Sequence, residues 1–144
     1  MINTNNIEEA KKLIAQEKKP IMVMAQNDEF NRKVLEYGKF DVLVSAERGE
    51  RKKSARQIDS GFNHVLAAIA VKKNIALGID FNEIMGWNKK EKAERLCRII
   101  QNIKISRKAG VKIVVINAED KKAVFNILIS LGASTAQAKE AISF

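Results

Sequence analysis

The chain has 144 residues, of which 46% are hydrophobic and 30% are charged. With seven Gly and one Pro, this composition excludes a disordered, collagen-like or low-complexity chain and fits one globular domain over residues 1–144. No apolar run approaches the roughly 20 residues of a membrane span, and the polar residues 1–6 lack the apolar core of a signal peptide. The single cysteine, Cys97, excludes an internal disulfide and a cysteine zinc cluster. We therefore expect a protein of the reducing cytoplasm.

Positive charge is concentrated in the second part of the chain. The whole chain has 26 Lys and Arg residues against 17 Asp and Glu, which gives a formal net charge of +9. Residues 1–47 hold 7 basic and 8 acidic residues, whereas residues 48–144 hold 19 basic and 9 acidic residues. This imbalance favours a polyanionic partner, and nucleic acid is the commonest one.

Helix and strand patterns alternate along the chain. Apolar residues at helical spacing, together with caps and stops, predict helices at residues 7–16, 28–37, 60–73, 90–108, 118–131 and 135–142. Short continuous apolar runs predict buried strands at residues 21–25, 42–44, 75–79 and 113–116. The polar, basic stretch 45–57 reads as a loop. In the longest helix, the residues predicted to face inward are Ala93, Leu96, Cys97, Ile100 and Ile103.

This order predicts an α/β fold with a mainly parallel sheet of about four strand–helix units, preceded by a leading helix within residues 1–19. The crossovers should be right-handed. Four strands cannot close an eight-stranded barrel, so the sheet is open or forms part of a barrel. Such a sheet has two edges that need cover, and residues 21–25 form a flat apolar strand without charge. We therefore expect a homodimer or an obligate protein partner.

Acidic residues follow several of the predicted strands, and two interpretations are open. Asp28, Asp80 and Glu119 stand where the first turn of a helix would begin, which favours helix capping. The alternative is a metal site at the strand ends. A multinuclear zinc or manganese phosphoesterase needs several histidines, and this chain has only one. We therefore expect no catalytic residue and no metal site in the protein.

The one histidine, His64, is predicted to lie opposite the apolar stripe of its helix. No nucleophile motif accompanies it, so a role as a general base is weakly supported. A structural hydrogen bond to Asp59 or to the loop backbone is the simpler interpretation, and contact with an RNA phosphate or base is a third. The chain also lacks a Gly-rich phosphate loop and a Gly-x-Ser-x-Gly elbow.

The strongest functional signal is a basic segment after the second strand. Residues 48–56 contain five positive charges and one negative charge, and they lie at the edge where parallel sheets bind ligands. We interpret this segment as a phosphate-binding loop, and the alternative is a solvated surface loop. The residues predicted to contact RNA here are Arg48, Arg51, Lys52, Lys53 and Arg56.

A second basic region covers residues 89–112, with nine basic and two acidic residues. Arg95 and Arg98 are predicted opposite the apolar stripe, which would give that helix a basic outer face. Lys72 and Lys73, at the end of the preceding helix, are added to the predicted RNA contacts.

Aromatic residues are few in these basic regions. Phe62 and Phe81 fit the core, which leaves Trp87 as the remaining candidate for stacking. This pattern favours recognition of the backbone and shape of structured RNA over stacking on unpaired bases.

Several motifs occur in an order that is familiar. Residues 58–67 include Asp59, Gly61 and His64, and they are followed by Lys-Lys-Asn at 72–74 and a strand that ends in Ala-Leu-Gly. Gln-Asn-Asp at 26–28 follows the first strand, and the tail contains Leu-Gly, Gln-Ala-Lys and Ile-Ser at 131–132, 137–139 and 142–143. Together these motifs resemble the protein component 3 family of archaeal and eukaryal ribonuclease P. The resemblance covers residues 21–144.

The resemblance implies a TIM-barrel-like fold of the polymerase-and-histidinol-phosphatase type. Family members are usually longer and begin with further strand–helix units, so a shortened form of the fold is expected here. In this family the protein is not the catalyst, because the RNA subunit cleaves the 5′ leader from precursor tRNA with bound Mg²⁺. The protein supports that RNA together with a small Pop-type subunit, and it meets precursor tRNA only indirectly. Asp59 and Gly61 then belong to a structural motif.

The leading hypothesis is therefore a noncatalytic, RNA-binding subunit of ribonuclease P in the cytoplasm, with no membrane contact. One alternative is a small metal-dependent phosphoesterase or nuclease, which the histidine count disfavours. Another is an RNA-binding scaffold of a different ribonucleoprotein.

Overall fold

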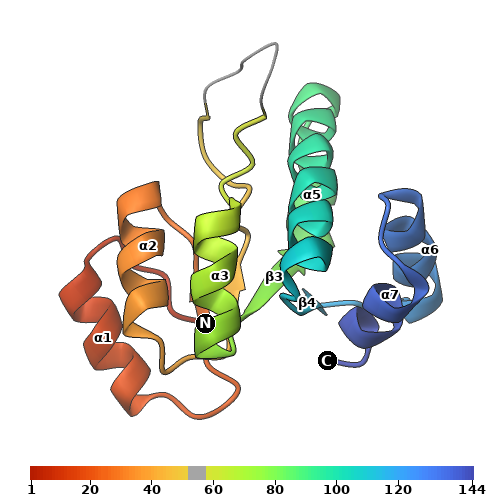
Figure 1. Cartoon of the computed structure of the whole chain (residues 1–144). Helices are drawn as coiled ribbons and strands as arrows, with labels where there is room; N and C mark the ends of the chain where they lie inside the picture. The colour runs from red at the N-terminus through yellow and green to blue at the C-terminus, as the bar shows by residue number, and fades with distance from the viewer. Residues whose placement is uncertain (52–57) are drawn as a thin grey trace.

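The computed structural model describes residues 1–51 and 58–144, and its centre is a four-stranded sheet with every strand parallel (Figure 1). The strands lie in the order of the chain: β1 (Met22–Met24), β2 (Val42–Val44), β3 (Ala76–Asp80) and β4 (Ile113–Ile116). The helices of the described residues are α1 (Ile7–Gln16), α2 (Asp28–Tyr37), α3 (His64–Lys73), α4 (Phe81–Met85), α5 (Lys89–Ala109), α6 (Lys121–Ser130) and α7 (Thr135–Ile142). This arrangement confirms the α/β prediction and corresponds to part of a TIM-barrel-like sheet.

Helix starts follow side-chain caps more closely than apolar spacing. Asn63 accepts a hydrogen bond from the Leu66 N–H, so α3 begins at His64 rather than at the predicted residue 60. Asp120 caps α6 in the same way, so α6 begins at Lys121 rather than at the predicted residue 118. The short helix α4, which the sequence analysis missed, begins where Asp80 accepts the N–H groups of two following residues.

The inward face of α5 differs from the prediction. The buried positions are Arg95, Ile99, Asn102, Ile103 and Ser106. By contrast, Cys97 and Ile100 are exposed, so the predicted stripe was wrong by part of a turn. The difference arises because two polar residues of α5 face inward: Arg95 contacts Glu47, and Asn102 contacts the Ser60 carbonyl. The spacing of apolar residues cannot predict such polar contacts.

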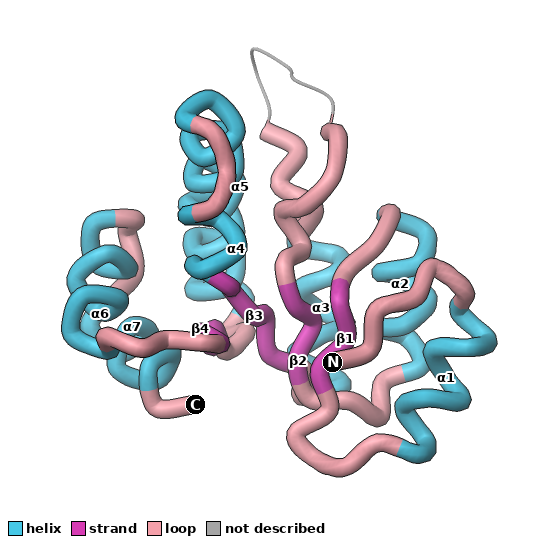
Figure 2. The backbone as a smooth tube through the Cα atoms, turned by 180° about the vertical axis from the view of Figure 1, so that it is seen from behind, coloured by secondary structure: helices cyan, strands magenta, loops and turns pink. Residues whose placement is uncertain are grey.

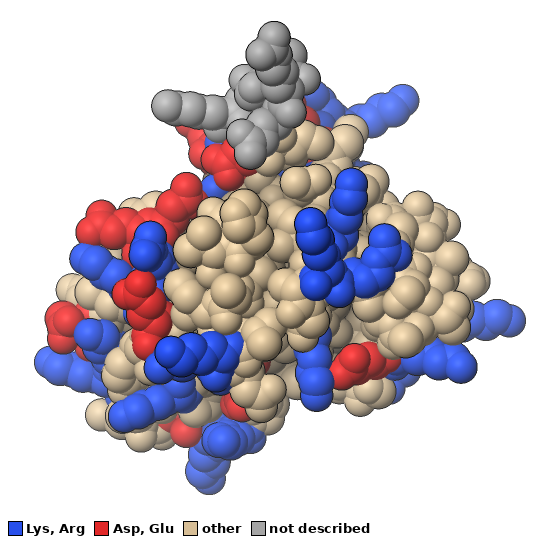
Figure 3. Space-filling view, in the orientation of Figure 1, with Lys and Arg blue, Asp and Glu red and all other residues tan. Residues whose placement is uncertain are grey.

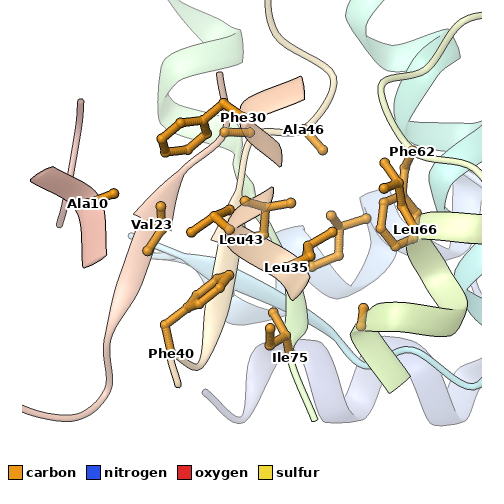
Figure 4. Packing of buried hydrophobic residues seen from close by; sticks show 14 of the residues in the cluster. Ala10, Val23, Phe30, Leu35, Phe40, Leu43, Ala46, Phe62, Leu66 and Ile75 are labelled. Carbon is orange, nitrogen blue, oxygen red and sulfur yellow. The ribbon is translucent and has the colours of Figure 1, made fainter. Parts of the chain in front are cut away.

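One face of the sheet carries helices, and the other is a narrow apolar surface. Figure 2 shows the tube from behind, with the strands in front of the helices. Toward the helices, residues such as Val23 and Leu43 pack with Leu35, Phe40 and other apolar side chains (Figure 4). On the opposite face, a smaller cluster joins β2 to β4 through the buried side chains of Val42, Val44, Val114 and Ile116.

Gly78 of β3 allows the side chains of β2 to pack closely on this second face of the sheet. A Cβ atom at this position would lie 2.7 Å from Cγ1 of Val42 and 3.2 Å from Cγ2 of Val44. The β2 side chains therefore lie over the β3 backbone, which is a close approach that only glycine permits.

The β1 edge is partly covered by the chain itself. The Ile2 N–H donates to the Met22 carbonyl at 2.9 Å, and the Met24 N–H donates to the Ile2 carbonyl at 2.8 Å. The expectation that β1 is a bare edge was therefore wrong in part. β4 ends the other side of the sheet and packs against α7. Among the described residues, no helix is long and apolar enough to cross a membrane.

Candidate functional site

Charged side chains meet at the carboxyl ends of β2 and β3, where parallel sheets place their ligand sites. Glu47 follows β2, Glu83 lies in α4 just after β3, and Arg95 reaches both from α5. The Arg95 Nη2 lies 2.6 Å from Oε1 of Glu47, and its Nη1 lies 3.3 Å from Oε1 of Glu83. Arg48 Nε joins the same Glu83 oxygen at 3.2 Å, and the Ser45 hydroxyl donates to the other oxygen at 3.3 Å. The result is one connected network of ions.

The ion pair at the centre of this network is buried from solvent. Only 2% of the Glu47 side chain and 3% of the Arg95 side chain is exposed. Burial raises the pKa of the Glu47 carboxyl, and the Arg95 charge acts in the opposite direction. A buried charge that loses its partner is strongly destabilising, so these two side chains fix α5 against the end of β2.

A second arginine fixes the start of the basic segment. Arg51 Nη1 lies 2.8 Å from Oδ1 of Asp28 and 3.1 Å from Oδ1 of Asp59, while Nη2 donates to the Ala46 carbonyl. Its Nε donates to the Arg48 carbonyl at 3.2 Å. Only 6% of the Arg51 side chain is exposed, so its donors serve the protein itself.

Gly61 makes room for this arrangement. Its φ is +78°, and a Cβ atom there would collide with the Ala46 carbonyl oxygen and the Arg51 guanidinium. Asp59 accepts the Gly61 N–H at 3.1 Å in addition to its ion pair with Arg51. Asp59 and Gly61, which were predicted to form a structural motif, therefore hold Arg51 and the neighbouring backbone in place.

The residues predicted to contact RNA do not form one surface. Arg95 is buried, so its place on a basic outer face was wrong, because its charge pairs with Glu47. Arg98 is half-buried and donates through Nη1 to the carbonyls of Glu47 and Gly49. Arg48 keeps 37% of its side chain exposed, while Lys52, Lys53 and Arg56 lie outside the described residues.

The remaining predicted contacts lie on α3. His64 is its first residue, exposed as predicted and on the same side of the sheet as the ion network. Within the described ranges the His64 imidazole makes no hydrogen bond, and Asp59 pairs with Arg51 instead. Lys72 and Lys73 are exposed in the last turn, at the opposite end of the helix.

Neither carboxylate of the ion network is open to a cation, since Glu47 and Glu83 both face arginines. Among residues 1–51 and 58–144, no group of three or more His, Cys, Asp and Glu side chains is arranged to hold a metal ion. Of the acidic residues expected to cap helices, Asp80 caps α4 as predicted. Asp28 is instead the first residue of α2, which Asn27 caps, and α6 is capped by Asp120 rather than by Glu119.

Sequence comparison finds relatives that share one name. Ribonuclease P protein component 3 of Methanocaldococcus jannaschii is 30% identical over 97 residues, which are 67% of this chain and 39% of that protein. The protein of the same name from Methanococcus maripaludis strain S2 is 24% identical over 113 residues, which are 78% of this chain and 46% of the relative. The resemblance to ribonuclease P protein component 3 is confirmed. The chain thus spans less than half the length of these relatives. No family model matches the chain.

The fold is also found in a solved structure. A chain of the cryo-EM structure of archaeal Ribonuclease P with mature tRNA superposes with a TM-score of 0.78 at 21% identity. The match covers 99% of this chain and 62% of the other. This match supports a shortened TIM-barrel-like fold.

Proposed function

We propose that this chain is a noncatalytic, RNA-binding subunit of ribonuclease P that supports the catalytic RNA during removal of the 5′ leader from precursor tRNA. The observation that carries the proposal is the sequence likeness to proteins named ribonuclease P protein component 3. The fold likeness to a chain of an archaeal Ribonuclease P complex is consistent with it.

The distribution of charge supports binding to a polyanion. Figure 3 shows Lys and Arg side chains gathered over the lower half of α5, while acidic side chains gather beside α2. Lys104, Arg107 and Lys108 are exposed in the second half of α5. Phosphate contacts from such residues supply sequence-independent affinity that falls with salt.

The proposed complex follows from the family resemblance. Its partners are ribonuclease P RNA and a small Pop-type protein subunit, with precursor tRNA held through the RNA. The divalent cations of the reaction, Mg²⁺ above all, are held by the RNA, and we expect the complex in the cytoplasm. A homodimer remains the alternative use of the β4 edge, because β4 has no strand neighbour on its outer side among the described residues.

Two measurements on the purified chain test this function. Labelled ribonuclease P RNA should bind in a fluorescence anisotropy titration more tightly than an unrelated structured RNA of equal length. The chain alone should hydrolyse neither precursor tRNA nor a phosphomonoester in Mg²⁺, Mn²⁺ or Zn²⁺. Equal binding of both RNAs would contradict the assigned partner, and metal-dependent turnover abolished by His64→Ala would contradict the noncatalytic role.

A further inference from the structure

A pocket of about 560 Å³ lies between the start of α5 and the first residues of the basic segment. Its lining includes Glu50, Trp87, Glu91, Arg95 and Arg98. This volume lies within the range of small-molecule sites and accommodates one nucleotide. The pocket is separate from the exposed basic surface over the second half of α5.

Trp87 gives the pocket an aromatic wall whose position is fixed. The Arg95 guanidinium carbon lies 5.0 Å from the centroid of the Trp87 ring, a cation–π distance. Arg95 is itself held by Glu47 and Glu83, so the ring rests on a buried, immobile cation. Trp87 is only half-buried, and it lines the pocket. A fixed aromatic ring beside an open pocket is a platform on which a base can stack.

One polar atom in the pocket wall has no partner. Arg95 Nε is buried and makes no hydrogen bond within the described part of the chain. The other two guanidinium nitrogens of Arg95 face Glu47 and Glu83. Because this nitrogen has almost no accessible surface, a molecule in the pocket would meet the Trp87 ring and the carboxylates rather than this donor.

The acidic side chains of the pocket favour binding of a base over binding of a phosphate group. Glu50 is exposed and Glu91 is partly exposed, and among the described residues neither makes an ion pair. Glu94 also lines the pocket, and these carboxylates together repel a phosphate. A carboxylate does accept a hydrogen bond from the exocyclic amino group of a base, as Glu and Asp do from cytosine N4. Lys89 and Lys90, in the same first turn of α5, are exposed and supply positive charge for the adjoining phosphates.

We propose that this pocket captures one unpaired nucleotide of an RNA, with its base stacked on Trp87 and its exocyclic amino group bound by Glu91 or Glu50. Bases that carry this amino group, such as cytosine and adenine, are preferred over uracil. The proposal rests on the proposed RNA-binding function, which it deepens by assigning a mode of recognition. The sequence analysis favoured backbone and shape recognition over stacking, because aromatic residues are few in the basic regions.

Trp87 is the only tryptophan in the chain, so its fluorescence reports on this pocket directly. Single-stranded hexamers of cytidine, adenosine and uridine should be titrated into the full chain with excitation at 295 nm. We expect saturable quenching by the cytidine and adenosine hexamers at concentrations at least 5-fold lower than for the uridine hexamer. Glu91→Ala, which removes the acceptor, should reduce this preference, whereas Glu119→Ala, an exposed control that does not line the pocket, should leave it unchanged.

A second readout separates the pocket from the function on which it rests. By anisotropy of labelled cytidine hexamer, Trp87→Ala should lower affinity about 5-fold or more, and Trp87→Phe should retain most of it because phenylalanine also stacks. If no hexamer quenches Trp87 while ribonuclease P RNA still binds, the pocket proposal is wrong and the RNA-binding function stands. If neither the hexamers nor ribonuclease P RNA binds, both are wrong.

Discussion

Two groups of basic residues in the described part of the chain differ in what they contact. At the carboxyl edge of the sheet, Arg51 and Arg95 are buried and paired with carboxylates, and Arg98 bonds backbone carbonyls. Along α3 and the second half of α5, residues such as Lys73 and Lys104 reach solvent. The first group holds the site together, and the second group is available to a partner.

This difference shows why a count of positive charges overstates the binding surface. Arginine has a planar fork of five donors, which suits it to several fixed acceptors at once. Arg51 uses its fork on four acceptors in three segments of the chain. Lysine carries a single hydrated charge on a flexible chain, and the exposed lysines here keep that charge in water. The variants below test this division.

The largest expected effect follows removal of a buried arginine. Arg95→Ala leaves Glu47 charged and unpaired in a dry site, so we expect a loss of about 3–5 kcal/mol of unfolding free energy. Urea denaturation measures it, with Lys104→Ala as an exposed control that should stay within about 0.5 kcal/mol. The double variant Glu47→Leu with Arg95→Met should recover much of the loss. Equal stability of Arg95→Ala and Lys104→Ala would contradict the structural role of Arg95.

A glycine pair tests the close packing around Arg51. Gly61 and Gly49 both have positive φ, of +78° and +85°, but only Gly61 would place a Cβ atom against its neighbours. Gly61→Ala should therefore cost about 1–3 kcal/mol more unfolding free energy than Gly49→Ala, which reports the backbone conformation alone. If the two variants lose similar unfolding free energy in thermal or urea denaturation, the packing around Arg51 adjusts to a Cβ atom at little cost, and the account of Gly61 is wrong.

Salt dependence tests whether RNA is contacted by the later residues of the basic segment, which lie outside the described part of the chain, rather than by the buried Arg51. Replacing Lys52, Lys53 and Arg56 by Ala should reduce the slope of log affinity against log salt for ribonuclease P RNA by about 2, since each lost contact contributes about 0.7–0.9. Arg51→Ala should lower unfolding free energy and leave the slope of the folded fraction nearly unchanged. The control, with Lys12, Lys18 and Lys19 replaced by Ala, removes the same charge from exposed positions near α1. An identical slope for wild type and loop variant would make that loop a solvated surface.

The smallest expected effect is on pH dependence. Because burial raises the pKa of Glu47, the folded state holds this proton more tightly than the unfolded state. The contribution of Glu47 to stability is therefore largest below the ordinary pKa of glutamate and falls as pH rises through the folded pKa. Unfolding free energies of wild type and Glu47→Gln, measured from pH 4 to pH 8, should differ in this direction. A wild-type curve that rises relative to Glu47→Gln would show that Arg95 outweighs burial.

The sequence predicted the parts of this molecule that depend on local pattern. The strands, the parallel sheet, and helices such as residues 28–37 and 135–142 follow from apolar runs and from caps at Asn27 and Ser134. The inward face of α5 could not be predicted, because it is set by Arg95 and by Asn102, which donates to the Ser60 carbonyl. Both partners lie more than 40 residues away along the chain.

The candidate site was predicted in place but not in composition. The carboxyl ends of β2 and β3 hold it, as parallel topology requires. The sequence could not reveal that Arg95 forms a buried ion pair with Glu47. The signal that could have suggested it is Glu47 itself, an acidic residue that comes shortly after a fully buried strand, where a charge that becomes buried needs a cationic partner.

Co-purification tests the central claim most directly. The affinity-tagged chain should be expressed in the organism that encodes it, and the RNA that elutes with it should be sequenced against an untagged control. The account predicts that ribonuclease P RNA is the most enriched species, and that the eluate removes the 5′ leader from precursor tRNA while the chain purified away from RNA does not. Absence of ribonuclease P RNA from the eluate, with another RNA enriched in its place, would contradict the account and assign the chain to a different ribonucleoprotein.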